Sequence, residues 1–178
     1  MKISLNWIKK FVDVPAKYSA KELAELLTLR TCEVEGFEDE KVKFANMVVG
    51  QIIKLRTHSN ADKLHLVDTD IGGRVVQIVC GGQNLFEGMV VAVALPGSIV
   101  NWHGAGETVE LKETKIRGEL SFGMICAGEE INLPPSPPEF VTNMTELWTK
   151  MGIKPSKTGT PLAEALNFND IVFEIDNK

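Results

Sequence analysis

The stretch that decides the fold is "HSNADKLHLVDTDIGG", residues 58–73. It ends in Gly72-Gly73 and is followed by the apolar run "RVVQIVC", a pattern that predicts two strands joined by a tight hairpin turn. Further runs of strand character lie on both sides: "MVVGQIIKLR" (47–56), "MVVAVAL" (89–95), "TVELKETKIRG" (108–118) and "FGMICAG" (122–128). Five or more short strands with many glycines and no long helix are typical of a small closed or partly closed barrel, which we expect over residues 45–133.

The period of two assigns the side chains of the strand after residue 63 to two faces. Leu64 and Leu66 fall on one face, so we expect His65, Val67 and Thr69 on the other. The polar residues Asn60, Asp62 and Lys63 sit in the turn that enters the strand. Two interpretations stay open: a binding face rich in donors, or a solvated edge strand preceded by an Asx-type turn.

Two helices are indicated before the barrel. "SAKELAELLTLRT" (19–31) begins with Ser19 and has Glu22 three residues later, which predicts a capping box and a helix with one apolar face. "MKISLNWIKKFVD" (1–13) predicts a shorter amphipathic helix with Ser4 as its N-cap.

Breaks in the pattern predict the domain organisation. We interpret the acidic run "EVEGFEDEK" (33–41), with Gly36 as a turn, as a crossing between units. "LPPSPPEF" (133–140) cannot lie inside a sheet, and "IVFEIDNK" (171–178) reads as a final strand. The predicted fold is α+β and mostly β, a barrel inserted in a small discontinuous α/β domain. Its parts are 1–44 (outer domain), 45–133 (barrel), 134–156 (proline-rich connector) and 157–178 (outer domain, truncated).

Charge and composition limit the function classes. The chain has a net charge of −5, and residues 45–133 contain seven Lys or Arg against ten Asp or Glu, a net charge of −3. Because phosphate contacts dominate non-specific affinity for nucleic acids, this balance argues against a strongly electrostatic binder. No apolar run long enough for a membrane span and no signal-like start is present, so we expect a cytoplasmic protein without a membrane partner.

The usual catalytic signatures are absent from the sequence. It has no GxxxxGK[ST] phosphate loop, no GxSxG elbow and no HExxH. A nucleophile site or a metal site would have to be built from three cysteines and three histidines: Cys32, Cys80, Cys126, His58, His65 and His103. Nothing in the sequence orients these groups as a nucleophile and its base, and the spacing of His58, His65, Cys80 and Cys126 does not match structural zinc patterns. We therefore predict no catalytic residue and no metal ligand, and we interpret the thiols as small buried apolar groups.

Two more polar groups lie on predicted strands and loops. In "VCGGQN", two glycines permit close approach to the backbone, and Gln83 and Asn84 offer amides able to read base edges or sugars. In "KETKIRGELSFGM", Lys115 and Arg117 alternate on one strand face. Glycine turns and a solvated charged face are the alternatives.

Taken in order, "HSNADKLHLVDTDIGG", "QIVCGGQN", "ALPGS" and "KIRGELSFGMICAGEE" resemble the tRNA-binding module. This module is a five-stranded oligonucleotide-binding (OB) barrel found in several synthetases and in free-standing tRNA-binding proteins. With "MKISLNWIKKFVD" and "GTPLAEALNFNDIVFEIDNK" at its ends, the chain resembles the β subunit of bacterial phenylalanyl-tRNA synthetase, in which this barrel is inserted in the first domain. The resemblance implies an amino-terminal fragment of that subunit.

The resemblance also implies partners and site residues. It implies tRNA as the ligand, a synthetase α subunit reached through the full-length β subunit of a heterotetramer, and ATP and magnesium used by the whole enzyme but not by this non-catalytic fragment. Nine positions would line the nucleic-acid face: Asn60, Lys63, His65, Gln83, Asn84, Lys115, Arg117, Ser121 and Met124. The three cationic residues would contact phosphates, and the three amides would position sugars or base edges. A free-standing tRNA-binding or chaperone-like OB-fold protein, and a protein-interaction module that no longer binds RNA, are the alternatives.

Overall fold

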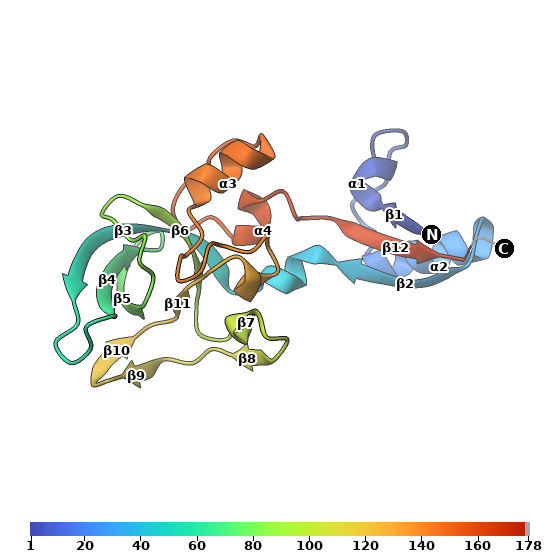
Figure 1. The fold of residues 1–178 in the computed structure, drawn as a ribbon. Coiled ribbons are helices and arrows are strands. Elements are labelled where there is room, and N and C mark those ends of the chain that lie inside the picture. The colour runs from blue at the N-terminus through green and yellow to red at the C-terminus, as the bar shows by residue number, and fades with distance from the viewer. Residues whose placement is uncertain (177–178) are drawn as a thin grey trace. The chain divides into compact units, whose positions relative to one another are not determined.

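A computed structural model describes residues 1–176, and the chain divides into two compact units (Figure 1). One unit combines residues 1–42 with the described residues from 167 onward, and the other consists of residues 43–166. The second unit contains the predicted barrel and therefore positions the candidate site.

The smaller unit is a three-stranded antiparallel sheet with two helices. Its elements are β1 (Lys2–Ser4), α1 (Leu5–Ile8), α2 (Ala20–Arg30), β2 (Val34–Asp39) and β12 (Ile171–Ile175). The strand β12 lies between β1 and β2, so the end of the chain pairs with its beginning. Residues 177–178, which the predicted final strand included, lie outside the described residues.

Both predicted helix caps are present in this unit. The Ser4 hydroxyl accepts a hydrogen bond from the backbone N–H of Trp7, and Ser19 and Glu22 form the predicted capping box. The apolar face of α2 packs against a small core that contains the fully buried Phe173.

The interpretation of residues 33–41 as a crossing is wrong, because most of this run forms β2. Val34 to Asp39 pair antiparallel with β12, and Gly36 is an ordinary strand residue opposite Glu174. The acidic side chains of β2 are mostly exposed, and its pairing partner lies far away in the sequence. Sequence pattern alone therefore gave no sign of the strand.

The larger unit is an antiparallel barrel. Its main sheet has the order β11-β6-β3-β4-β5, formed by β3 (Met47–Thr57), β4 (His65–Asp70), β5 (Val75–Cys80), β6 (Val90–Ala94) and β11 (Met124–Ile125). Two small hairpins pair β7 (Ile99–Asn101) with β8 (Thr108–Glu110), and β9 (Thr114–Ile116) with β10 (Glu119–Ser121). The short helical elements of this unit are η2 (Trp102–Gly104), η3 (Glu129–Ile131), α3 (Met144–Met151) and α4 (Leu162–Ala165), and η1 (Glu40–Phe44) spans the boundary after residue 42.

The segment after β10 closes the barrel against β5. The backbone N–H of Phe122 donates to the carbonyl of Gln77 at 2.9 Å. The side-chain amide of Gln77 donates to the carbonyl of Leu120 at 2.8 Å. With β11 paired to β6, the sheet returns nearly onto itself, and the predicted five-stranded OB-type barrel is confirmed.

The barrel interior is apolar, and it includes the face of β4 that carries Val67 and Thr69. Val67 packs in the core with Ile52 and Ile78, and all three are fully buried. Thr69 is also fully buried, and Leu66 on the opposite face is buried as well. Side chains on both faces of β4 are thus buried, and β4 pairs with β3 on one side and with β5 on the other, so the alternative of a solvated edge strand is wrong.

Residues 134–166 belong to the same compact unit as the barrel, although we assigned 134–156 to a connector and 157–178 to the outer domain. The helix α3 buries Trp148, whose indole N–H donates to the carbonyl of Ala165 in α4 at 2.9 Å. Just before α4, Pro161 forms an isolated bridge with Val48 of β3. Prolines open this segment, but the residues after them pack on the barrel.

Candidate nucleic-acid interface

A buried histidine fixes the turn that opens "HSNADKLHL". The backbone N–H of Asn60 donates to Nδ1 of His58 at 3.0 Å, so the ring proton sits on Nε2. Nε2 lies 3.2 Å from the carbonyl oxygen of Ile116 and donates to it. The Asn60 side chain also reaches the carbonyl of Arg117, at 3.5 Å. Residues 58–60 are thereby held against the β9–β10 hairpin.

The hairpin presents two of the predicted cationic residues. Ile116 pairs with Glu119, so Arg117 and Gly118 form a two-residue turn, and both have positive φ angles, 49° and 98°. Arg117 stands at the turn, and Lys115 lies two residues before it; both are exposed. The structure thus brings Asn60, Lys115 and Arg117 together at one edge of the barrel.

Two further predicted residues meet at a carboxylate that sequence analysis did not consider. Lys63 Nζ lies 3.9 Å from Glu139, and the Gln83 side chain donates to the same carboxylate. The backbone N–H of Gln83 also donates to the Glu139 carbonyl at 2.9 Å. Because Lys63 is exposed and its ion pair is long, the pair is worth little and leaves the ammonium available to a phosphate.

Two predicted contact residues, Asn84 and Ser121, also have structural roles. The Asn84 amide donates to the carbonyl of Val141 and accepts from its N–H, both at 2.9 Å. The Ser121 hydroxyl is buried, accepts from the N–H of Val79 and donates to the carbonyl of Gly123, each at 3.0 Å. Both side chains therefore already make hydrogen bonds inside the protein, and their role as RNA contacts stays a prediction.

The last two predicted residues are half-buried. His65 pairs with Cys80 across β4 and β5, and its Nδ1 is buried without a hydrogen-bond partner. Met124 in β11 lines a cleft that adjoins the hairpin. Neither residue extends the exposed basic edge formed by the hairpin and the turn.

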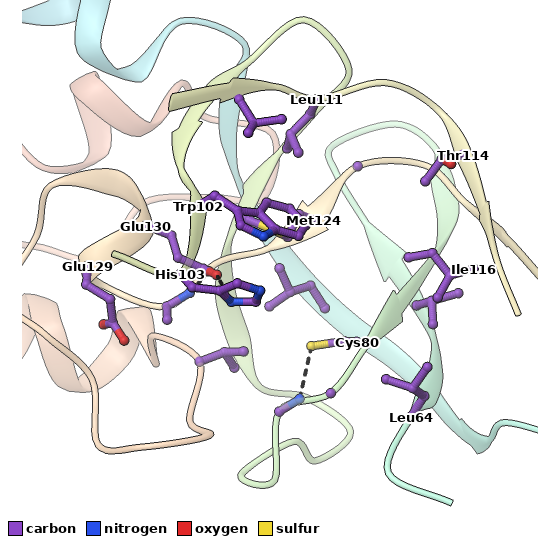
Figure 2. A pocket seen from close by; sticks show the side chains of 18 of the residues that line it. Leu64, Cys80, Trp102, His103, Leu111, Thr114, Ile116, Met124, Glu129 and Glu130 are labelled. Atoms are coloured by element: carbon purple, nitrogen blue, oxygen red, sulfur yellow. Dashed lines mark hydrogen bonds and ion pairs between the residues drawn. The ribbon is translucent and has the colours of Figure 1, made fainter. Parts of the chain in front are cut away.

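The cleft has a volume of about 730 Å³ and lies within the barrel unit. Leu64 and Ile116 lie toward one end, and Trp102, His103 and Glu130 toward the other (Figure 2). Its walls are mainly apolar, and its wall residues come from loops and strand ends widely separated in the sequence. No prediction from the sequence named this cleft.

Acid–base groups around the cleft do not form a catalytic set. Burial raises the pKa of the Cys80 thiol to about 11, and burial moves the pKa of Cys126 higher still, so both stay protonated and inert. Burial also raises the pKa of Glu130, whose carboxylate accepts from the N–H of Ala127 at 2.8 Å. Among residues 1–176, no group of three or more His, Cys, Asp or Glu residues is arranged to hold a metal ion.

Fold and surface together define a small OB-type β-barrel with a basic hairpin at one edge. Residues 47–143 match the family described as "Putative tRNA binding domain", and the chain belongs to this family. It is 42% identical over 134 residues to the phenylalanine–tRNA ligase beta subunit of Chlorobaculum tepidum, and 37% identical over 175 residues to that of Syntrophus aciditrophicus. The resemblance to this subunit is confirmed.

The alignments cover most of this chain but only a small part of each relative. The alignment takes in 75% of this chain and 16% of the Chlorobaculum protein, and 98% of this chain and 20% of the Syntrophus protein. The chain therefore spans about a fifth or less of these relatives. The crystal structure of the C-terminal domain of Plasmodium vivax p43 overlaps 47% of this chain and 46% of its own, with 22% identity and a TM-score of 0.36. Among the described residues, no helix is long and apolar enough to cross a membrane.

Proposed function

We propose that this chain acts as a tRNA-binding region of a phenylalanine–tRNA ligase β subunit and helps hold tRNA while the enzyme attaches phenylalanine to it. The observation that carries the proposal is the family match over residues 47–143, which coincides with the barrel. The two relatives described above carry the name of that subunit.

The proposed contact surface is the edge formed by the 58–63 turn and the β9–β10 hairpin. Lys63, Lys115 and Arg117 are exposed there and supply cations for phosphates, and Asn60 supplies an amide. Gln83 remains a proposed contact only if its carboxylate partner Glu139 moves. A surface of few cations on an acidic chain favours recognition of RNA shape at modest affinity.

The remaining chemistry belongs to the complete ligase. We propose that ATP and magnesium serve it, that an α subunit joins the β subunit in a heterotetramer, and that the enzyme works in the cytoplasm. Residues 1–176 contain no group of three or more His, Cys, Asp or Glu side chains that could hold magnesium, so we propose no metal contact for them. We assign this chain binding and no catalytic step.

A salt-dependent titration tests the proposal. The chain is titrated with phenylalanine tRNA and with an unrelated tRNA at several salt concentrations. The variant Lys115→Ala/Arg117→Ala is expected to bind more weakly, with a log–log salt slope shallower by about 1.4 to 1.8, because each lost phosphate contact removes about 0.7 to 0.9. Lys150→Ala/Lys154→Ala removes the same charge from an exposed surface at and beyond α3 and should leave binding unchanged.

The outcomes separate the candidate functions. Equal affinity for both tRNAs with a steep salt dependence supports recognition of shape. Equal weakening by both double variants means that general charge, and not the hairpin, attracts the RNA. No binding even at low salt contradicts the proposal and favours a protein-interaction module, the alternative that the net charge of −3 over residues 45–133 supports.

A further inference from the structure

The cleft beside the hairpin is a second surface that the tRNA proposal does not use. Apolar side chains such as Leu64, Leu111 and Ile116 line it, and the indole of Trp102, which is 41% exposed, faces it (Figure 2). Its volume of about 730 Å³ is that of a site for a sizeable ligand or for several peptide side chains.

The charges around this cleft have mostly one sign. Its charged lining residues are four carboxylates and one ammonium: Glu110, Glu129, Glu130, Glu139 and Lys112. Such a surface attracts cations and repels the phosphates of RNA. The cleft and the basic edge of the barrel therefore have opposite preferences, although they adjoin each other at Ile116.

The carboxylate best placed to bind a cation is that of Glu130, whose side chain is only 12% exposed. One of its oxygens accepts from the N–H of Ala127, and the other lies 3.9 Å from Nδ1 of His103, which is beyond hydrogen-bond range. A guanidinium reaching this second oxygen has the nearby indole of Trp102 on which to stack. By contrast, Glu129 accepts from the N–H of Ser136, and Glu139 is engaged by Lys63 and Gln83.

We propose that this cleft binds a peptide segment of a protein partner that presents an arginine next to apolar side chains. The arginine pairs with Glu130 and stacks on Trp102, and the apolar side chains fill the end near Leu64 and Ile116. Charge complementarity favours this occupant over single-stranded RNA, whose phosphates would meet the carboxylates. The proposal does not rest on tRNA binding, because it concerns different residues and the opposite charge.

Three synthetic twelve-residue peptides test the proposal on the isotope-labelled 178-residue chain. One contains arginine and leucine, the second has glutamate in place of arginine, and the third has serine in place of leucine. The first is expected to shift the indole N–H resonance of Trp102 and the amides of Leu64 and Ile116, and to bind about tenfold more tightly than the other two. An eight-nucleotide RNA of mixed sequence is titrated in parallel.

Matched variants distinguish the cleft from general charge. Glu130→Gln keeps an oxygen that can accept from the N–H of Ala127 but removes the negative charge. It should lower the affinity for the arginine peptide about tenfold. Glu164→Gln removes an exposed carboxylate of α4 outside the cleft and should change binding less than twofold. The proposal is overturned if the RNA shifts the cleft resonances and the peptides do not, if no probe shifts them, or if both variants have the same effect.

Discussion

Replacement of Gly72 by alanine tests how the segment before α4 is joined to the barrel. Gly72 lies in the β4–β5 turn with a φ of 85°, and a Cβ added to it would stand 2.4 Å from the Cα of Gly159. Gly159 has a φ of 81°, and its own Cβ would stand 2.7 Å from the Cα of Gly72. The two backbones therefore touch in a way that only glycine permits.

The expected cost of Gly72→Ala has two parts. Forcing alanine into the left-handed region costs about 1–2 kcal/mol. Relief of the overlap requires a displacement of about 1 Å toward an ordinary contact distance of about 3.5 Å, at a typical overpacking cost of about 1–3 kcal/mol. That displacement strains the hydrogen bond of 2.8 Å from the N–H of Gly159 to the carbonyl of Val49. The total is about 2–5 kcal/mol.

Gly73 is the matched control, because it has a φ of 98° and an added Cβ would meet nothing within 4 Å. Gly73→Ala should therefore cost only the backbone part, about 1–2 kcal/mol. Urea unfolding followed by far-UV circular dichroism and by tryptophan fluorescence measures the loss of stability in both variants. Trp148 reports on the affected segment, because its indole N–H donates to the carbonyl of Ala165. Equal destabilisation by the two variants would refute the reasoning, since the overlap with Gly159 would then have no energetic consequence.

Three further predictions concern buried polar groups. His58→Ala removes the link between the 58–60 turn and the β9–β10 hairpin, so it should destabilise the chain by about 1–3 kcal/mol and speed hydrogen exchange at the Asn60 amide; unchanged exchange would contradict this. Because burial raises the pKa of Glu130 in the folded chain, its contribution to stability is present at low pH and lost as pH rises through that pKa. In urea titrations, the free energy of unfolding of Glu130→Gln relative to that of the parent chain should therefore be higher at pH 7 than at pH 4. A difference between variant and parent that does not change with pH would contradict this. Among the thiols, half-buried Cys32 should react with a thiol reagent in the native chain, and the other two only after unfolding; native reaction of all three would contradict their burial.

Local signals in the sequence predicted much of the fold. The capping box of Ser19 and Glu22 and the paired glycines at 72 and 73 act within a few residues of themselves, so they could be read without knowledge of distant partners. The acidic β2 escaped prediction because what makes it a strand is β12, more than a hundred residues later in the chain. Its mostly exposed acidic side chains carry no apolar alternation.

The candidate site was predictable only in its exposed part. Asn84 and Ser121 have the right chemistry for reading RNA, but their partners lie 57 and 42 residues away, at Val141 and Val79. A sequence shows that an amide or hydroxyl is present and does not show that its hydrogen bonds are already used. Glu139 was missed because it follows a proline cluster that we interpreted as a connector.

The most direct test of the central claim is to map tRNA onto the labelled chain by its amide resonances at low salt. The account predicts that phenylalanine tRNA perturbs Asn60, Lys63, Lys115 and Arg117, and that the perturbations fade as salt is raised. The Trp102 indole in the cleft should be unaffected. Perturbations confined to α3 or to the cleft, or none at all, would contradict the assignment of the barrel's hairpin edge as the tRNA surface.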